Sequence, residues 1–278
     1  MKTTVVLVAL VVAAATLAAG AGANGSPYSP GLSYGWPGIA LPGRGTNVVA
    51  FGMPKSTIVA LVRARDGEVL RSTVVRGFYG VPLVTYDGTT GGLSGDGKWV
   101  TLSSYGPHPG LEGRTRFTVL STATLEQRRS LVLRGSWSYD ASSPNGSLLY
   151  LVQHFKASPS PRYRIRLYDV AAGRLHPTPV VDRLGSEATM RGQPVTRTTS
   201  GTGRWAYTLY ARKQHPPFVH ALDTASRQAY CVDLTSLKLS GQRQWELRLS
   251  LESESRLAVK RGARTVALVD TKALKVVG

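Results

Sequence analysis

The feature of this sequence that most restricts its fold is a repeat of about 50 residues. A two-residue turn precedes an apolar run five times, at 44–45, 96–97, 145–146, 202–203 and 254–255. A second marker, an apolar run that ends in a polar residue, recurs in step with the first, at Arg63, Ser121, Asp169, Asp223 and Asp270. Two markers in step indicate one structural unit that occurs five times.

Each unit contains four short segments typical of strands, and no stretch has a helical period. Asn145-Gly146 and Asp96-Gly97 permit the positive φ that two-residue hairpins need. An Asp after the third segment can accept hydrogen bonds from backbone amides two residues later. The chain is therefore predicted to be all-β, with about five four-stranded antiparallel units. A repeated four-stranded unit is typical of the blades of a β-propeller.

Five segments resemble the repeats of a known family. The sequences GLSGDGKWVTL (92–102), ASSPNGSLLYL (141–151) and TSGTGRWAYTL (199–209) are similar to the first turn of WD-like and YVTN-type β-propeller repeats. VHALDTASRQ (219–228) and VALVDTKALKV (266–276) are similar to the third strand and its turn in the same proteins. The resemblance covers residues 36–278, and it implies a fold without implying a function. Since no Trp-Asp or Gly-His dipeptide occurs, the chain is not a strict WD repeat.

The first 23 residues have the pattern of a secretory signal peptide. Lys2 supplies a positive start, Val5–Ala18 is apolar apart from Thr16, and Ala21-Gly22-Ala23 is a small-residue cleavage site. Cleavage before Asn24 predicts a secreted, extracytoplasmic protein of a bacterial cell envelope, with no transmembrane span after cleavage. An uncleaved anchor is the alternative, although the apolar run is shorter than the roughly 20 residues that span a bilayer.

The domain organisation follows from these boundaries. Residues 1–23 form the signal peptide, 24–35 a flexible lead-in rich in Gly, Ser, Pro and Tyr, and 36–278 the propeller domain. Its five units are predicted at about 36–77, 78–135, 136–182, 183–240 and 241–278. The sequence favours closure of the five units into a ring, because a ring leaves no exposed sheet edges. Residues 28–41 could then cover the seam; alternatively, an open arc forms a dimer through its ends.

Charge and cysteine content limit the function. The 34 Lys and Arg residues outnumber the 16 Asp and Glu residues, for a net charge of +18. Because the basic residues are spread over many segments, we expect a loose attraction to anionic surfaces. Nucleic acid is not an expected partner, since the protein is predicted to be exported and lacks a base-stacking motif. A single Cys, Cys231, excludes an internal disulfide and a Cys-based metal site.

Three histidines form one candidate site. The family resemblance implies that ligands bind on the face where the second-to-third and fourth-to-first strand connections emerge. His108, His154 and His215 fall in predicted second-to-third loops of three neighbouring units. Imidazoles on one face could bind a transition metal. The alternative is that they are solvated or bonded to local backbone, so the presence of a metal stays unknown. His220, in contrast, is predicted to be a core histidine inside a strand.

The predicted innermost strands carry a second candidate site. Asp87 and Asp140 follow tyrosines at the start of two units, and Arg191 and Arg197 lie in the next unit. Near a propeller axis, these groups could bind a polar ligand or an ion, or the carboxylates could serve as an acid and a base. Alternatively, the two Asp side chains cap turns and pair with neighbouring Arg.

Nucleophile and nucleotide motifs are absent from the sequence. The segment 92–95 lacks the frame of a nucleophile elbow, and no phosphate-binding loop occurs. We therefore expect no catalytic residue and no cofactor. The leading hypothesis is an exported, non-catalytic β-propeller that binds a protein, peptide or cell-envelope glycan through one ring face. The alternative is a propeller enzyme, either a hydrolase or lactonase or a quinoprotein-like oxidoreductase, with an axial active site.

Overall fold

The computed structural model describes residues 31–104, 113–156, 162–185 and 189–278, and this part is almost entirely β-structure. The predicted signal peptide and residues 24–30 of the lead-in lie outside the described residues, as does His108. Among the described residues, no helix is long and apolar enough to cross a membrane.

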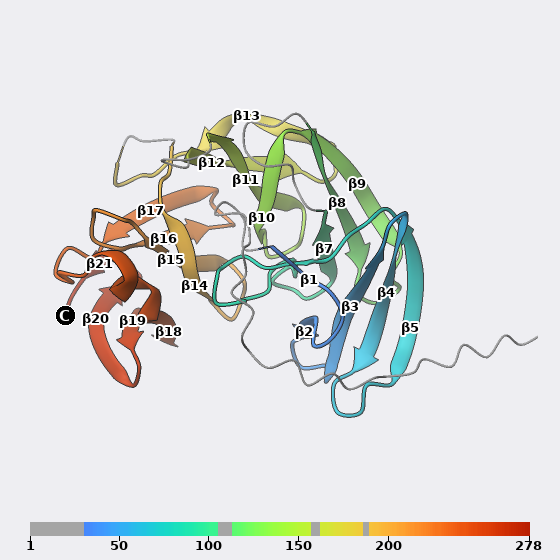
Figure 1. Ribbon diagram of the computed structural model, residues 1–278, viewed down its shortest axis with the longest axis horizontal. Coiled ribbons are helices and arrows are strands. Elements are labelled where there is room, and N and C mark those ends of the chain that lie inside the picture. The colour runs from blue at the N-terminus through green and yellow to red at the C-terminus, as the bar shows by residue number, and fades with distance from the viewer. Residues whose placement is uncertain (1–30, 105–112, 157–161, 186–188) are drawn as a thin grey trace, which may run out of the picture.

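Five antiparallel sheets of three or four strands follow one another along the described residues (Figure 1). The first contains β2 (Ile39–Leu41), β3 (Thr46–Met53), β4 (Ser56–Arg63) and β5 (Val69–Arg76), and the second contains β7 (Trp99–Ser103), β8 (Arg114–Ser121) and β9 (Gln127–Arg134). The third contains β10 (Ser136–Ser142), β11 (Leu148–Lys156), β12 (Arg162–Asp169) and β13 (Arg174–Val180). The fourth contains β14 (Gln193–Thr199), β15 (Trp205–Ala211), β16 (Phe218–Asp223) and β17 (Gln228–Asp233). The fifth contains β18 (Leu247–Ser253), β19 (Arg256–Arg261), β20 (Arg264–Asp270) and β21 (Lys275–Val276).

The second sheet has three strands where four were predicted. Its inner position is taken by residues 80–93, which pair with β7 only through the isolated bridges Gly80–Ser103 and Leu93–Val100. A hairpin closed by a bridge between Leu83 and Thr90 interrupts this segment and prevents a continuous inner strand. Before the hairpin, β6 (Val81–Pro82) pairs with β1 (Leu32–Ser33), so the end of the lead-in is held beside the second sheet.

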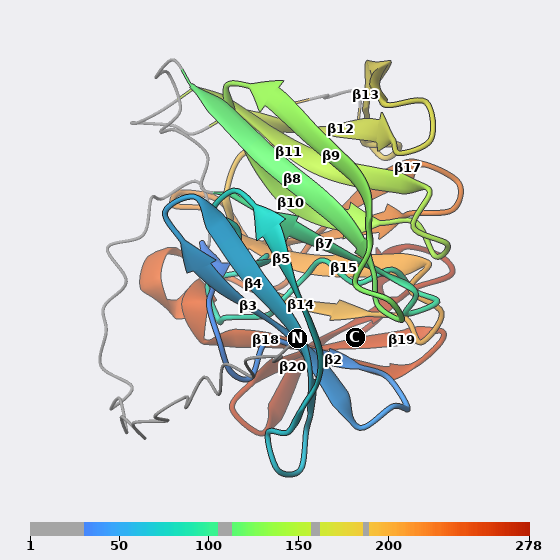
Figure 2. The same ribbon diagram turned by 90° about the vertical axis from the view of Figure 1, so that its right-hand side faces the viewer.

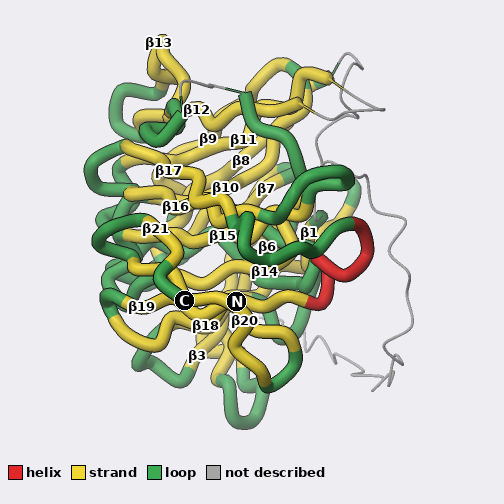
Figure 3. Tube along the Cα trace, turned by 90° about the vertical axis from the view of Figure 1, so that its left-hand side faces the viewer, coloured by secondary structure: helices red, strands yellow, loops and turns green. Residues whose placement is uncertain are grey.

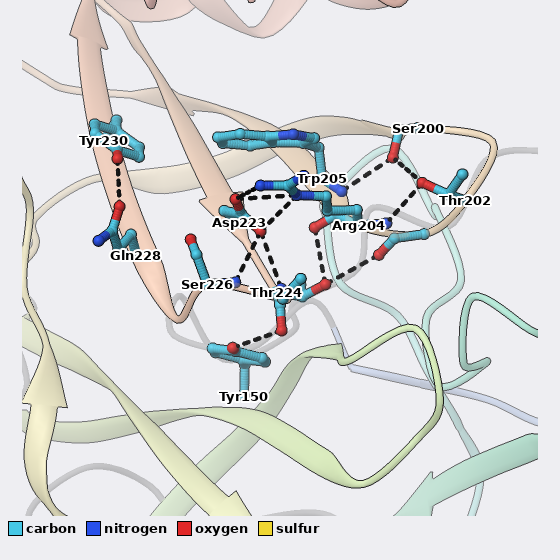
Figure 4. A network of polar contacts seen from close by, with 12 residues as sticks. Tyr150, Ser200, Thr202, Arg204, Trp205, Asp223, Thr224, Ser226, Gln228 and Tyr230 are labelled. Atoms are coloured by element: carbon cyan, nitrogen blue, oxygen red, sulfur yellow. Dashed lines mark hydrogen bonds and ion pairs between the residues drawn. The ribbon is translucent and has the colours of Figure 1, made fainter.

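The two sequence markers repeat in step because they contact each other. The residue after the third strand donates its backbone N–H to the first turn of the same sheet, for example Thr224 to Arg204 O at 2.8 Å. Where this residue is Thr, its hydroxyl also bonds that turn, as Thr224 does to Gly203 O at 3.1 Å (Figure 4). Thr122 and Thr271 make the same contact in the second and fifth sheets, each at 2.6 Å. A hydrogen bond thus holds the two markers next to each other in each sheet.

The acidic residues that end the third strands cap the turns that follow, as the sequence predicts. Asp223 Oδ1 accepts from the amides of Ala225 and Ser226 at 3.0 and 3.1 Å. Asp169 and Asp270 cap their turns in the same way. In the fourth sheet, Asp223 also pairs with Arg204 at 2.7 Å. Tyr150 of the third sheet donates its hydroxyl to Thr224 O at 2.9 Å, which ties this turn to the neighbouring sheet.

The sheets pack face to face around an arc (Figures 1 and 2). Separate apolar clusters join the first sheet to the second, the second to the third, the third to the fourth and the fourth to the fifth. No cluster of the described residues joins the fifth sheet to the first, and Figure 1 shows them apart at the two ends of the arc. The expected closed ring is therefore not what the described residues form, and residues 31–41 do not cover a seam.

The first turns of the second, third and fourth sheets gather into a hub. Asp96 N donates to Pro144 O at 2.8 Å. Gly95 and Gly203 approach so closely that a Cβ on Gly203 would lie 2.4 Å from the Gly95 Cα. Gly203 also has a φ of +70°. Both the backbone conformation and the contact between sheets therefore require glycine at position 203.

This hub generates a stability prediction. Gly203→Ala should destabilise the protein by the positive-φ cost, about 1–2 kcal/mol, plus about 1–3 kcal/mol for the backbone overlap with Gly95. Gly97→Ala is a matched control, because Gly97 has a φ of +67° in the equivalent turn and open space around its Cβ position. Urea unfolding midpoints measure both. Equal losses in the two variants would contradict a tight hub.

Candidate functional site

The candidate site lies where the inner strands of the third and fourth sheets meet. Arg197 of β14 forms an ion pair with Asp140 of β10, and it also donates to the Asp140 backbone oxygen. The two side chains are only 6% and 2% exposed. Arg197 Nε donates to Thr208 Oγ1 at 2.8 Å, so most of the guanidinium is engaged within the protein. Burial alone would lower the pKa of Arg197, but the Asp140 carboxylate outweighs it and leaves the pKa raised.

The strand register extends this pair into a polar row across the fourth sheet. Arg197 lies opposite Thr208, Thr208 opposite His220, and His220 opposite Cys231. Apolar clusters between the third and fourth sheets lie beside this row, one around Ala206 and Leu222 and another around Tyr210 and Phe218. The row is thus a strip of polar side chains at an otherwise apolar interface.

Two atoms in this strip lack a hydrogen-bond partner among the described residues. They are Asp140 Oδ2 and His220 Nδ1, both fully buried. His220 is therefore the predicted core histidine, although the core does not satisfy both of its nitrogens. Burial lowers the pKa of His220 to about 4, although the nearby Asp140 carboxylate acts in the opposite direction. At neutral pH the ring is uncharged.

The other reactive groups beside the strip are held in their protonated forms. Tyr163 and Tyr210 stack at 6.0 Å, and Tyr210 meets the His220 ring edge-on at 6.1 Å. Burial raises the pKa of both tyrosines. Burial also raises the pKa of the Cys231 thiol, and the nearby Asp182 carboxylate raises it further. None of these environments activates a nucleophile, because activation needs a lowered pKa.

Asp87 lies at the tip of the central hairpin, residues 83–90, which crosses the inside of the arc to the fourth sheet (Figure 1). Its backbone N–H donates to Val195 O at 3.1 Å. Its carboxylate accepts from Thr85 Oγ1 at 2.6 Å and from Thr89 Oγ1 at 2.7 Å. Burial acts to raise the pKa of Asp87, but these hydrogen bonds and one from Thr196 leave it lowered. Asp87 therefore caps its own turn, while Asp140 pairs with Arg197.

The candidate histidines have different surroundings. His154 lies inside β11, where the sequence predicts the start of a loop; it is buried, and Nε2 contacts Ser138 Oγ at 3.0 Å. Burial lowers its pKa to about 4. His215 is exposed in the β15–β16 connection. Arg191, which lies just before β14, is exposed as well. Among the described residues, no three His, Cys, Asp or Glu side chains converge as metal ligands would.

The sequence does not predict that residues 212–217 are held in place by hydrogen bonds from a distant side chain. The 3₁₀-helix η1 (Gly241–Glu246) connects the fourth and fifth sheets (Figure 3), and it places Gln244 in a fully buried position. Gln244 Oε1 accepts from Arg212 N at 2.7 Å, and Nε2 donates to the backbone oxygens of Arg212, His215 and Leu239 at 3.1, 2.8 and 3.0 Å. One side chain thus fixes the connection that carries exposed Lys213, Gln214 and His215.

This connection and η1 belong to one face of the molecule. In a four-stranded antiparallel unit, the second-to-third and fourth-to-first connections emerge at the same end of the strands. We call this end the loop face, represented in the described residues by 212–217, 234–246 and the exposed Arg191. Lys213, Lys238 and Arg243 are exposed there as well. The loop face is therefore cationic and, at 212–217, internally braced.

No protein-family model matches the chain, and no curated protein sequence matches it. Solved structures with a similar arrangement include hydrazine synthase of Kuenenia stuttgartiensis, 15% identical over 88% of this chain and 78% of that chain, with a TM-score of 0.42. A chain of the mitotic checkpoint complex is 13% identical over 90% and 65% of the two chains, with a TM-score of 0.45. The β-propeller domain of Cps50 (Swd1) from Myceliophteria thermophila is 14% identical over 87% and 65%, with a TM-score of 0.41. At these identities the similarities concern the arrangement of strands alone.

The buried ion pair generates a prediction. Arg197→Met should destabilise the protein by about 3–5 kcal/mol, because it leaves the Asp140 carboxylate buried without its counter-charge. The double variant Asp140→Leu/Arg197→Met should be less destabilised than Arg197→Met alone, since it removes both buried charges. Arg63→Met, which removes a surface pair with Glu68, should cost at most about 1 kcal/mol. Urea unfolding compares the three, and a double variant as unstable as the sum of its parts would contradict the coupling.

The buried histidines generate a pH prediction. His154 and His220 have a folded pKa of about 4, below the ordinary value of 6.5, so the unfolded chain binds more protons between these values. The contribution of these two histidines to the free energy of unfolding should be fully present above pH 6.5 and should be lost as the pH falls towards 4. Unfolding midpoints at pH 7 and 4.5 measure this loss, and His220→Gln should reduce it. The exposed His215→Gln serves as control, and an equal reduction there would contradict the assignment.

Proposed function

We propose that the protein is an exported, non-catalytic β-propeller-type binding protein of the WD-like or YVTN type, and that its loop face binds an anionic protein, peptide or cell-envelope glycan. The observation that carries this proposal is the bracing of residues 212–217 by Gln244. A loop held in one conformation before binding loses little entropy when a partner docks on it. Export is part of the proposal and rests on the signal-like residues 1–23.

The charge of the loop face supports an anionic partner. Arg191, Lys213, Lys238 and Arg243 are exposed on it. Basic residues near an anionic surface contribute about 1 kcal/mol each, so three or four give roughly millimolar binding by charge alone. Specific contacts to the braced loop would have to supply the remaining affinity.

The polar strip supports binding over catalysis. Asp140 and Arg197 are paired with each other, Asp87 caps a turn, and His154 is buried. The enzyme alternative needs these side chains to face a substrate. In the described residues they instead contact other parts of the protein. No specific observation favours the hydrolase, lactonase or quinoprotein alternative, and we keep one candidate function.

The loop face can be tested with two anionic probes, vesicles that contain 30% phosphatidylglycerol and a poly-glutamate peptide. We expect binding that weakens with salt and that falls about tenfold or more in Lys213→Glu/Arg243→Glu. The control pair Arg174→Glu/Lys272→Glu changes the net charge equally at third-to-fourth turns on the opposite face. Co-sedimentation and fluorescence anisotropy measure the two probes.

Two results would contradict the proposed face. One is an equal loss of binding in both pairs of variants, which would mean that binding depends on the net charge of +18 and not on the loop face. The other is binding to neither probe at low salt. Circular dichroism of each variant checks that the exposed substitutions leave the sheets intact.

A further inference from the structure

The outward face of the first sheet carries an exposed apolar row. Of the two faces of this sheet, one packs on the second sheet through Val48, Ala50 and Val59. On the other face, Phe51 of β3 lies opposite Ile58 of β4, which lies opposite Val74 of β5. These three side chains are 43%, 36% and 66% exposed. They form one continuous row across the sheet.

Most residues around this row are also uncharged, apart from Arg76 of β5, which is exposed on the same face opposite Ser56. Val69 lies opposite Val62 on the same face, and Val49, Ala60 and Val62 form a small buried cluster beside the row. By strand alternation, every position on this face of β3 and β4 is uncharged: Asn47, Val49, Phe51, Met53, Ser56, Ile58, Ala60 and Val62. Of the fourteen large hydrophobic side chains exposed in the described residues, five lie on this face: Phe51, Met53, Ile58, Val69 and Val74. Such a concentration marks an interaction surface, because monomeric proteins rarely expose apolar patches of this kind.

The opposite end of the arc does not complement this face. The fifth sheet buries Leu247, Leu257 and Val259 against the fourth sheet. Its outward face carries Arg248 and Lys260, which lie opposite each other, and Lys260 pairs with Glu252 at 3.5 Å. Docking this face on Phe51, Ile58 and Val74 would desolvate several charges without new partners. Neither closure of one chain nor head-to-tail association of two chains is therefore favoured.

We propose that the outward face of the first sheet binds the same face of a second copy, so that two arcs form a symmetric dimer. The uncharged row matches itself, whereas it does not match the charged end of the arc. Contact between identical faces closes on itself and leaves no apolar end for further growth. Two sheets packed face to face repeat the packing that already joins neighbouring sheets within the chain. Because each copy carries +18, salt should strengthen this association, the opposite of its effect on the anionic probes.

The experiment measures the mass of the protein in solution. Light scattering after size exclusion, and sedimentation velocity from 5 to 100 µM at 0.1 and 0.5 M NaCl, follow the full chain and a chain that begins at Asn24. We expect twice 29.8 kDa for the full chain and twice its own mass for the shorter chain, with a larger dimer fraction at high salt. Val74→Glu and Val74→Lys should each weaken the dimer at least tenfold. Both variants are needed, because a dimer that is weakened by a negative and by a positive charge alike depends on an apolar contact at this position.

Val132→Glu is the matched control, since Val132 lies in β9, the outer strand of the second sheet, and is 49% exposed. It should change dimerisation by less than threefold. The proposal is overturned if the chain is monomeric at all concentrations, or if neither Val74 variant weakens the dimer. It is equally overturned if Val132→Glu weakens it as much, or if association disappears when residues 1–23 are removed. Thermal unfolding of the Val74 variants checks that each remains folded.

Discussion

Each sheet of this protein buries its apolar face only by packing on the next sheet, and the rest of the structure depends on this constraint. An isolated four-stranded sheet would expose Val48, Ala50 and Val59 to water. Stacking sheets along an arc solves the problem for every sheet except those at the ends. The first sheet keeps an exposed apolar row on its outward face, whereas the fifth sheet ends the arc with charges.

Hydrogen bonds between turns keep the sheets in a fixed order around the arc. Within a sheet, the residue after the third strand bonds the first turn, as Thr224 does with Arg204. Between sheets, Tyr150 reaches Thr224, and Gly95 meets Gly203 in the hub. These contacts cost little side-chain entropy because they use backbone atoms and short side chains. They leave the opposite end of the strands free to carry the longer connections of the loop face.

Much of the fold could be predicted from the sequence because turn residues and alternation are local signals. Asp223 caps its turn as its position after a strand implies. The candidate site could be predicted only in part. The sequence names Asp140 and Arg197, but it cannot show that they pair, because they are 57 residues apart and meet only when two sheets pack. Gln244 gives no clear local signal, since three of its four amide hydrogen bonds go to backbone of the β15–β16 connection, about 30 residues earlier. The sequence predicts a loop at His154 because the apolar run ends at residue 152. In the structure β11 continues to Lys156 and includes His154.

The sequence by itself determined the strand order within each unit, the turns and the all-β class, since each follows from residues within about 50 positions of one another. Tertiary structure decided three other features. The central hairpin replaces a regular inner strand in the second sheet, because its tip bonds β14. The sheets form an arc and not a ring, since no apolar cluster of the described residues joins the fifth sheet to the first. Arg197 and Asp140 of the polar strip pair with each other, because the packing of the third and fourth sheets brings the two buried side chains together.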